Sequence, residues 1–136
     1  MKINIKRLQS SMDAINSISI TPDGGVSRLA LSDADKKARD MLKQWMMEAG
    51  LDVRIDDVGN IYGFRSGLNN NSHPICLGSH LDTQPNGGKF DGTLGVMVAL
   101  EVIRTLNDNK VQTQHPFKII NWTNEEGARF KPALMG

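Results

Sequence analysis

The sequence of 136 residues lacks several features that would mark particular classes of protein. Its one cysteine, Cys76, cannot form an internal disulfide, which is typical of a protein from a reducing compartment. No apolar run approaches the ~18 residues of a membrane span. The first residues also lack the continuous apolar stretch and small-residue cleavage site of a secretory signal. We therefore expect a cytoplasmic protein that does not span a membrane.

Concentrated charge of one sign is also missing. The chain has 16 lysines and arginines against 15 aspartates and glutamates, a net charge of +1, and its basic residues are scattered. Binding to nucleic acid or to a membrane surface draws on clustered positive charge. We expect neither as a partner.

The length fits one domain, since domains usually have ~100–200 residues. Apolar residues recur at helical spacing over residues 4–17. A second helix should begin after Ser32, a good N-cap, and end at Gly50, a good C′ residue. The segment GTLGVMVALEVIRTLNDN, residues 92–109, is apolar around most of its circumference. It is predicted to form a third, mostly buried helix.

Alternating apolar and polar residues predict a hairpin with strands near 51–56 and 60–65, joined by a tight turn at Gly59-Asn60. PICLGSH, residues 74–80, reads as a short apolar strand, and HPFKIINWT, residues 115–123, as another. With the helix between them they form a βαβ pattern. The predicted fold class is therefore α/β, with a mixed, largely parallel sheet flanked by helices.

Several polar residues gather at one edge of the predicted sheet. His80 ends one strand, and Glu125 and Glu126 follow another. Between the two strands, the glycine-rich stretch GSHLDTQPNGGKFDGTLGV carries Asp82 and Asp91. Open α/β sheets place their ligands in the crevice outside the carboxyl ends of the strands. We expect these side chains to meet there.

Each of these residues alone has an ordinary explanation. His80 could be structural, Asp91 could be the N-cap of the following helix, and Glu125 and Glu126 could be solvated loop acids. Together they make a donor set of imidazole and carboxylates, which suits Zn²⁺, Mn²⁺ or Co²⁺. Asp82 is placed to accept the other ring N–H of His80, a common support for a metal ligand.

Other chemistries have weaker support. Ser79 is not flanked by the glycines of a nucleophile elbow, and the glycines of residues 87–95 match neither a P-loop nor a dinucleotide fingerprint. Cys76 lies inside an apolar strand, where we expect it to be buried and inert. His73 and His115 each precede a proline at the start of a strand, and we interpret both as structural.

The glycine-rich stretch and NEEGARF, residues 124–130, resemble the signatures of the M20-type metal-dependent amidohydrolases. The similarity extends through GGVSRLALSDADKKARD and MEAGLDVRIDDVGNIYG, so it takes in most of the chain. Asp91 follows His80 by only eleven positions in the sequence (91 − 80 = 11). This short interval and the NEEGARF ending favour the branch of N-carbamoyl-L-amino-acid hydrolases, with allantoate amidohydrolase and β-ureidopropionase.

The resemblance implies a role for each residue and a zinc-peptidase-like catalytic domain. His80 looks like a ligand of one metal, Asp91 like the carboxylate that bridges two metals, and Glu126 like a ligand of the second. Glu125 looks like the general base and Asp82 like the orienting acid. The implied cofactors are two divalent ions, Zn²⁺, Mn²⁺ or Co²⁺, and bridged pairs of this kind lie ~3.5–4 Å apart.

The family also has two histidine ligands further along the chain, and a lid domain that carries its homodimer contacts. Because this chain ends at Gly136, we expect residues 1–136 to be the N-terminal portion of the catalytic domain and to be inactive alone. The implied substrates are N-carbamoyl amino acids or ureido compounds such as allantoate and β-ureidopropionate. The alternatives are an M20-type peptidase or N-acyl amino acid amidohydrolase, and a non-catalytic remnant or association module.

Overall fold

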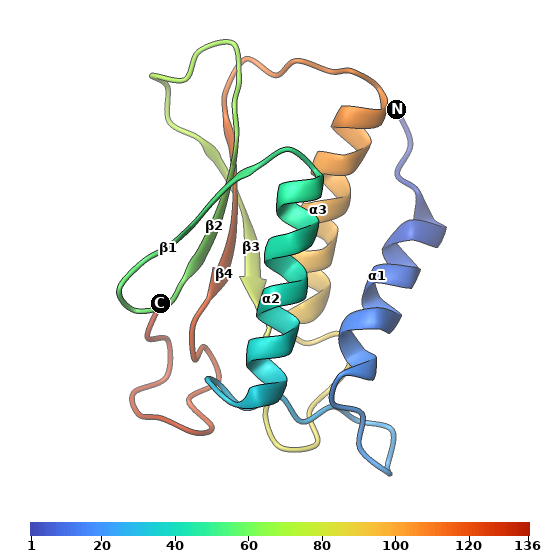
Figure 1. Cartoon of the computed structure of the whole chain (residues 1–136), viewed down its shortest axis with the longest axis vertical. Helices are drawn as coiled ribbons and strands as arrows, with labels where there is room; N and C mark the ends of the chain where they lie inside the picture. Colours follow the sequence, from blue (N-terminus) through green and yellow to red (C-terminus); the bar gives the residue numbers. More distant parts are fainter.

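The computed structural model describes all of residues 1–136. Three helices lie on one face of a four-stranded sheet (Figure 1). The helix α2 packs on β1 and β2, α3 packs on β3 and β4, and α1 packs against α3. None of the helices has the length and hydropathy needed to cross a membrane. The elements in chain order are α1 (Ile5–Ser17), α2 (Asp33–Glu48), β1 (Asp52–Ile55), β2 (Ile61–Arg65), β3 (Ile75–His80), α3 (Thr93–Asp108) and β4 (Phe117–Trp122).

The sheet is mixed, as expected, with strand order β1-β2-β4-β3. The predicted βαβ unit is confirmed, since β3 and β4 are parallel neighbours joined by α3. The expectation of a largely parallel sheet holds for this pair only, because β1–β2 and β2–β4 are antiparallel. The short loop between β1 and β2 requires these two strands to be antiparallel. The strand β2 in turn lies antiparallel to β4.

The helix ends follow the sequence signals. Asn4 caps α1 by accepting a hydrogen bond from the N–H of Arg7 at 3.0 Å. Ser32 caps α2 by accepting from the N–H of Asp35 at 3.2 Å. Gly50 has φ +80° just after α2, a left-handed conformation that favours glycine. The predicted starts and stops of both helices are therefore confirmed to within a residue or two.

The hairpin between β1 and β2 is confirmed, but its connection is not a two-residue turn. Residues 56–60 form the loop, and the Asp56 carboxylate accepts hydrogen bonds from the N–H groups of Val58 at 3.1 Å and Asn60 at 2.8 Å. Gly59 has φ +96° within it. Because the Asp56 side chain caps these backbone groups, the loop is longer and the strands are shorter than the alternation indicated.

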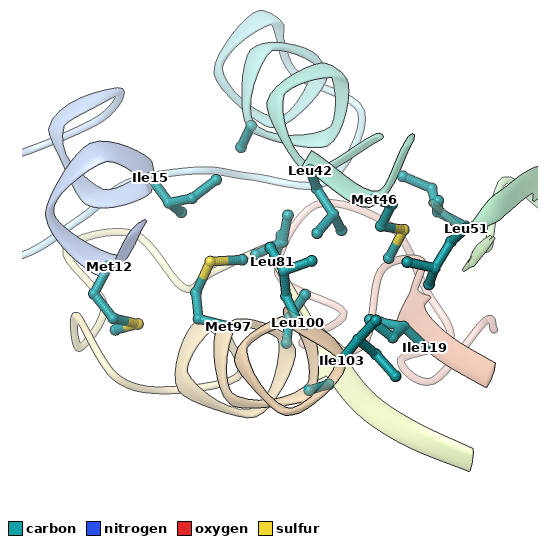
Figure 2. Packing of buried hydrophobic residues seen from close by; sticks show 14 of the residues in the cluster. Met12, Ile15, Leu42, Met46, Leu51, Leu81, Met97, Leu100, Ile103 and Ile119 are labelled. Carbon is teal, nitrogen blue, oxygen red and sulfur yellow. The ribbon is translucent and has the colours of Figure 1, made fainter. Parts of the chain in front are cut away.

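The hydrophobic core lies between the helices and the sheet (Figure 2). Leu42 and Met46 from α2, and Leu100 from α3, are fully buried in it. Leu81, in the loop after β3, is also fully buried and lies among them. The loop that leaves His80 is therefore anchored in the core at its first residue. The full cluster is Met12, Ile15, Ala38, Leu42, Met46, Leu51, Ile61, Leu81, Val96, Met97, Ala99, Leu100, Ile103, Leu106 and Ile119.

The opposite face of the sheet carries no helix (Figure 1). Cys76 is exposed, so the expectation that it is buried is wrong. The cause is that β3 is an edge strand and alternate side chains of the sheet face away from the helices. The helix α3 is buried on the side that faces the core, as predicted. On its other side Leu94 and Val98 are each 40% exposed.

Candidate metal site

The parallel pairing of β3 and β4 determines where the site forms. His80 is the last residue of β3 and pairs with Trp122, the last residue of β4. The chain that leaves each strand therefore emerges at the same edge of the sheet, and Glu125 and Glu126 follow β4 after a short turn. The expected meeting of the two segments is confirmed. His73 and His115 precede β3 and β4, at the opposite end of the strands, and both are exposed.

His80, Asp91 and Glu126 converge at this edge. Each offers one ligand atom, and these atoms all lie within 4.8 Å of one another. The His80 Nε2 atom is 4.0 Å from Asp91 Oδ1. Zinc binds such nitrogen and oxygen ligands at ~2.0–2.2 Å, so the three groups are close enough to share divalent ions after small side-chain rotations. The donor set of one imidazole and two carboxylates fits Zn²⁺, Mn²⁺ or Co²⁺.

Asp91 does not act as the cap of α3. The N-cap of that helix is Gly92, and no side chain donates to or accepts from the cap position. The Asp91 side chain is 67% exposed and lies near His80 and Glu126. The Asp91 carboxylate is therefore free to bind a metal ion, which favours the metal interpretation over the capping one.

The two adjacent glutamates face different neighbours. Glu125 Oε2 lies 3.3 Å from His80 Nε2, and the Glu125 side chain is one-third exposed. Glu126 Oε2 accepts a hydrogen bond from Gln84 Nε2 at 2.7 Å. Gln84 was not among the residues singled out from the sequence. Its position in the glycine-rich stretch, two residues after Asp82, is the one signal that could have indicated it.

Asp82 supports His80 in a way that differs from the expectation. The His80 Nδ1 atom is 2.9 Å from the backbone oxygen of Asp82 and 3.7 Å from its carboxylate. Because a carbonyl oxygen only accepts, Nδ1 is the donor in this contact, and Nε2 is the ring nitrogen that faces Asp91 and Glu125. The carboxylate of Asp82 instead accepts the backbone N–H groups of Glu125 and Glu126, each at 3.2 Å. Asp82 is 3% exposed, and it joins the two halves of the site.

Gly92 allows the start of α3 to lie directly against His80. It has φ +60° and ψ −53°, a conformation that a residue with a side chain rarely adopts. A Cβ atom at this position would lie 2.5 Å from His80 Nε2 and 2.5 Å from the His80 backbone oxygen. The glycine is therefore required for the approach of Asp91 to His80.

The glycine-rich stretch is held along one side by an earlier segment of the chain. Val26 and Gly87 exchange backbone hydrogen bonds of 3.0 and 2.7 Å, and the N–H of Thr83 donates to the oxygen of Arg28 at 2.9 Å. These bonds comprise one isolated antiparallel bridge, at Val26 and Gly87, and one further backbone bond between the two segments. The loop that carries the site is thus fixed by its backbone despite its composition.

Asn124 begins the second half of the site in a left-handed conformation, with φ +52°. Asparagine tolerates this region better than most residues. Its side-chain N–H groups donate to the backbone oxygens of Phe130 and Pro132, each at 3.0 Å. The turn after β4 is therefore fixed by contacts within the chain, and it directs Glu125 and Glu126 toward His80.

The chain is similar in sequence to known proteins. Residues 76–136 match the family model described as peptidase family M20/M25/M40. The N-carbamoyl-L-amino-acid amidohydrolase of Rhizobium meliloti is 46% identical over 134 residues, which is 98% of this chain and 32% of that protein. The ureidoglycolate hydrolase of Arabidopsis thaliana is 38% identical over 136 residues, which is 100% of this chain and 29% of that protein.

The fold has matches among solved structures. A hydantoinase/carbamoylase family amidase from Burkholderia ambifaria superposes with a TM-score of 0.95 and 51% sequence identity, over 97% of this chain and 33% of that one. The chain thus spans about a third of the length of the proteins it matches. The resemblance carried by the two motifs is confirmed, since residues 76–136 match the model of peptidase family M20/M25/M40 and the similar proteins include N-carbamoyl-L-amino-acid amidohydrolases and hydantoinase/carbamoylase family amidases.

Proposed function

We propose that this chain supplies metal-binding residues of a hydrolase that uses two metal ions to cleave a C–N bond in N-carbamoyl amino acids or related ureido compounds. The convergence of His80, Asp91 and Glu126 within 4.8 Å carries the proposal. The similarity to proteins named for N-carbamoyl-L-amino acids and for ureidoglycolate supports the substrate class. Both names denote small molecules in which a carbonyl carbon is bonded to two nitrogens. Allantoate and β-ureidopropionate contain the same group.

In this proposal His80 would hold one ion and Glu126 the other, and the Asp91 carboxylate, close to both side chains, would contribute to binding each. Bound ions of this type lower the pKa of a water molecule and polarise a carbonyl oxygen. Glu125 accepts the proton of the attacking water and passes it to the leaving nitrogen. Its carboxylate is suited to this role because it lies beside His80 Nε2 while one-third of the side chain remains in contact with solvent.

Asp82 and Gln84 orient the other groups. The backbone oxygen of Asp82 fixes the His80 ring, and its carboxylate holds the peptide that carries both glutamates. Gln84 donates to the Glu126 carboxylate and limits its rotation. Partners of this kind raise the basicity of ligands and hold them in place.

We also propose that residues 1–136 alone have no measurable amidohydrolase activity. Asp91 is 67% exposed, so the site opens directly to solvent. An open site cannot hold a substrate in one orientation, and positioning can supply ~7–11 kcal/mol of a barrier. The chain spans about a third of its relatives, and we propose that further ligands, substrate contacts and the contacts of a homodimer come from the parts outside it.

The catalytic roles can be tested in a chimera in which residues 1–136 replace the matching segment of the Rhizobium meliloti enzyme. Ammonia release from N-carbamoyl amino acids gives the rate, and metal analysis gives the content. Glu125→Gln should keep its metal and lose ~10²–10⁴-fold in rate, as expected for a general base. Glu126→Gln should lose metal. The reverse pattern would show that the roles of the two glutamates are exchanged.

The inactivity of residues 1–136 can be tested directly on the chain loaded with Zn²⁺, Mn²⁺ or Co²⁺. His80→Ala should reduce metal binding, whereas His73→Ala, a matched change at an exposed histidine away from the site, should not. Ammonia release should not exceed that of the metal alone. Turnover above that blank, lost in His80→Ala, would contradict the proposed inactivity.

A further inference from the structure

Arg28 is a fully buried arginine, with 0% exposure, in the segment before α2. No carboxylate lies within ion-pair distance of its guanidinium, and all of its hydrogen bonds go to neutral groups. Arginine is rarely fully buried without a paired charge, because removing the charge from water is costly. An arginine at this position calls for a role that an apolar residue could not fill.

The guanidinium joins the two segments that flank His80 and Asp91. Its Nε donates to the backbone oxygen of Leu81 at 2.6 Å, and its Nη2 donates to the Thr93 hydroxyl at 2.9 Å. Leu81 lies between His80 and Asp82, and Thr93 is two residues after Asp91. One rigid side chain thus contacts the chain immediately behind each of these two groups.

Further contacts tie the same residue to its surroundings. The Arg28 Nη1 donates to the backbone oxygen of Ile15 in α1 at 3.3 Å. Its backbone N–H donates to the Thr83 hydroxyl at 2.8 Å, and its backbone oxygen accepts from the N–H of Thr83 at 2.9 Å. The guanidinium is therefore itself held in place by backbone bonds to the loop that it supports.

We infer that Arg28 is a positioning residue, which sets the separation of His80 and Asp91 by linking Leu81 to Thr93. The inference deepens the proposed function and rests on it for the identity of the ligands. Arg28 acts through its two neighbours and touches neither ligand. The planar guanidinium suits this task because it presents several donors in fixed directions.

The chemistry of the position explains why arginine is needed. Burial lowers the pKa of Arg28, while the charges of Asp35 and Asp82 oppose that effect from a distance. A lysine could donate to the same oxygens but not in a rigid fork. An apolar side chain would leave the Leu81 and Ile15 oxygens without this donor, and unsatisfied buried groups are destabilising.

The test uses two variants, Arg28→Lys and Thr93→Val, in residues 1–136. Thr93→Val removes one acceptor of the guanidinium at nearly constant volume. Thr105→Val is the matched control, because Thr105 is a buried threonine of the same helix whose hydroxyl donates to Glu101 away from the site. Hydrogen exchange of the metal-free chain reports on the backbone, and titration with Co²⁺ reports on the ligands.

We expect faster exchange in residues 80–84 and 91–95 of both variants, with Co²⁺ affinity lower by about 10–100-fold. Thr105→Val should change neither quantity. Unchanged local exchange in both variants would overturn the inference. If Arg28→Lys does not fold, Thr93→Val decides, since it retains the arginine. If the unaltered chain binds no Co²⁺, the proposed metal site fails, whereas the exchange measurement still decides the role of Arg28.

Discussion

Replacing Gly92 with alanine perturbs the candidate site at its closest contact. The backbone there has φ +60° and ψ −53°, so any side chain is strained. The added methyl would also lie 2.5 Å from His80 Nε2, the nitrogen that faces Asp91 and Glu125. The change therefore acts together on the backbone and on the His80 atom that we propose binds a metal ion.

The cost can be worked out from these two parts. A residue held in a sparsely populated conformation costs about 1–3 kcal/mol. Forcing a methyl group into a packed site costs about 1–3 kcal/mol more. The sum of about 2–6 kcal/mol is a large share of the roughly 5–15 kcal/mol by which a domain is stable. Rotation of the His80 ring could relieve the overlap with Nε2 but not the one with the His80 backbone oxygen, and it would lose the 2.9 Å contact of Nδ1 with the backbone oxygen of Asp82.

Gly24→Ala is the matched control. Gly24 also has a positive φ, +82°, but a Cβ atom there would have no neighbour within 4 Å. It should cost about 1–2 kcal/mol from the backbone alone and leave metal binding unchanged. Urea unfolding measures the stability of both variants, and calorimetric titration with Zn²⁺ measures affinity. Gly92→Ala with the stability and Zn²⁺ affinity of Gly24→Ala would refute the reasoning.

Two further predictions concern stability away from the site. Burial opposes ionisation of Glu101, but hydrogen bonds from the Arg7 side chain, the Asn4 N–H and the Thr105 hydroxyl lower its pKa. Its stabilisation is therefore complete above its unfolded value of ~4.3 and is lost as the pH falls. Glu101→Gln should lower the free energy of unfolding by about 2 kcal/mol at pH 7, and the difference from the unaltered chain should disappear in acid. Urea unfolding at a series of pH values measures this difference. A difference that stays constant with pH would contradict the ionic explanation. Leu42→Ala, at a fully buried position, should lose about 2–5 kcal/mol at unchanged urea dependence, whereas a loss below about 1 kcal/mol would mean that the core around α2 is loosely packed.

The helices and the βαβ unit could be predicted because their signals are local. Ser32 and Gly50 mark the ends of α2 by their own chemistry, whatever the rest of the chain does. The direction of the hairpin relative to β4 and the exposure of Cys76 could not be predicted. Both depend on which strands become neighbours and on how many faces of the sheet are covered, and neither is encoded within a single segment.

The candidate site shows the same division. His80, Asp91 and Glu126 could be placed at one edge from strand order alone, since each follows or ends a predicted strand or precedes a helix. The support of His80 by the backbone of Asp82 could not, because every residue has a carbonyl oxygen and the sequence does not show which one a ring will meet. The role of Arg28 had no signal either, because its partners are two backbone oxygens and two hydroxyls distant in sequence.

The geometry of the site follows from strand register more than from the flexibility of its loop. His80 faces Trp122 across the parallel pair, so the next residues of both strands leave the sheet together. A slip of one residue would turn His80 to the other face of the sheet. The buried carboxylate of Asp82 then bonds both N–H groups of the turn after β4, which fixes that turn against the loop after β3. The glycines therefore serve close approach, as at Gly92, while hydrogen bonds from buried polar groups supply the rigidity that metal ligands require.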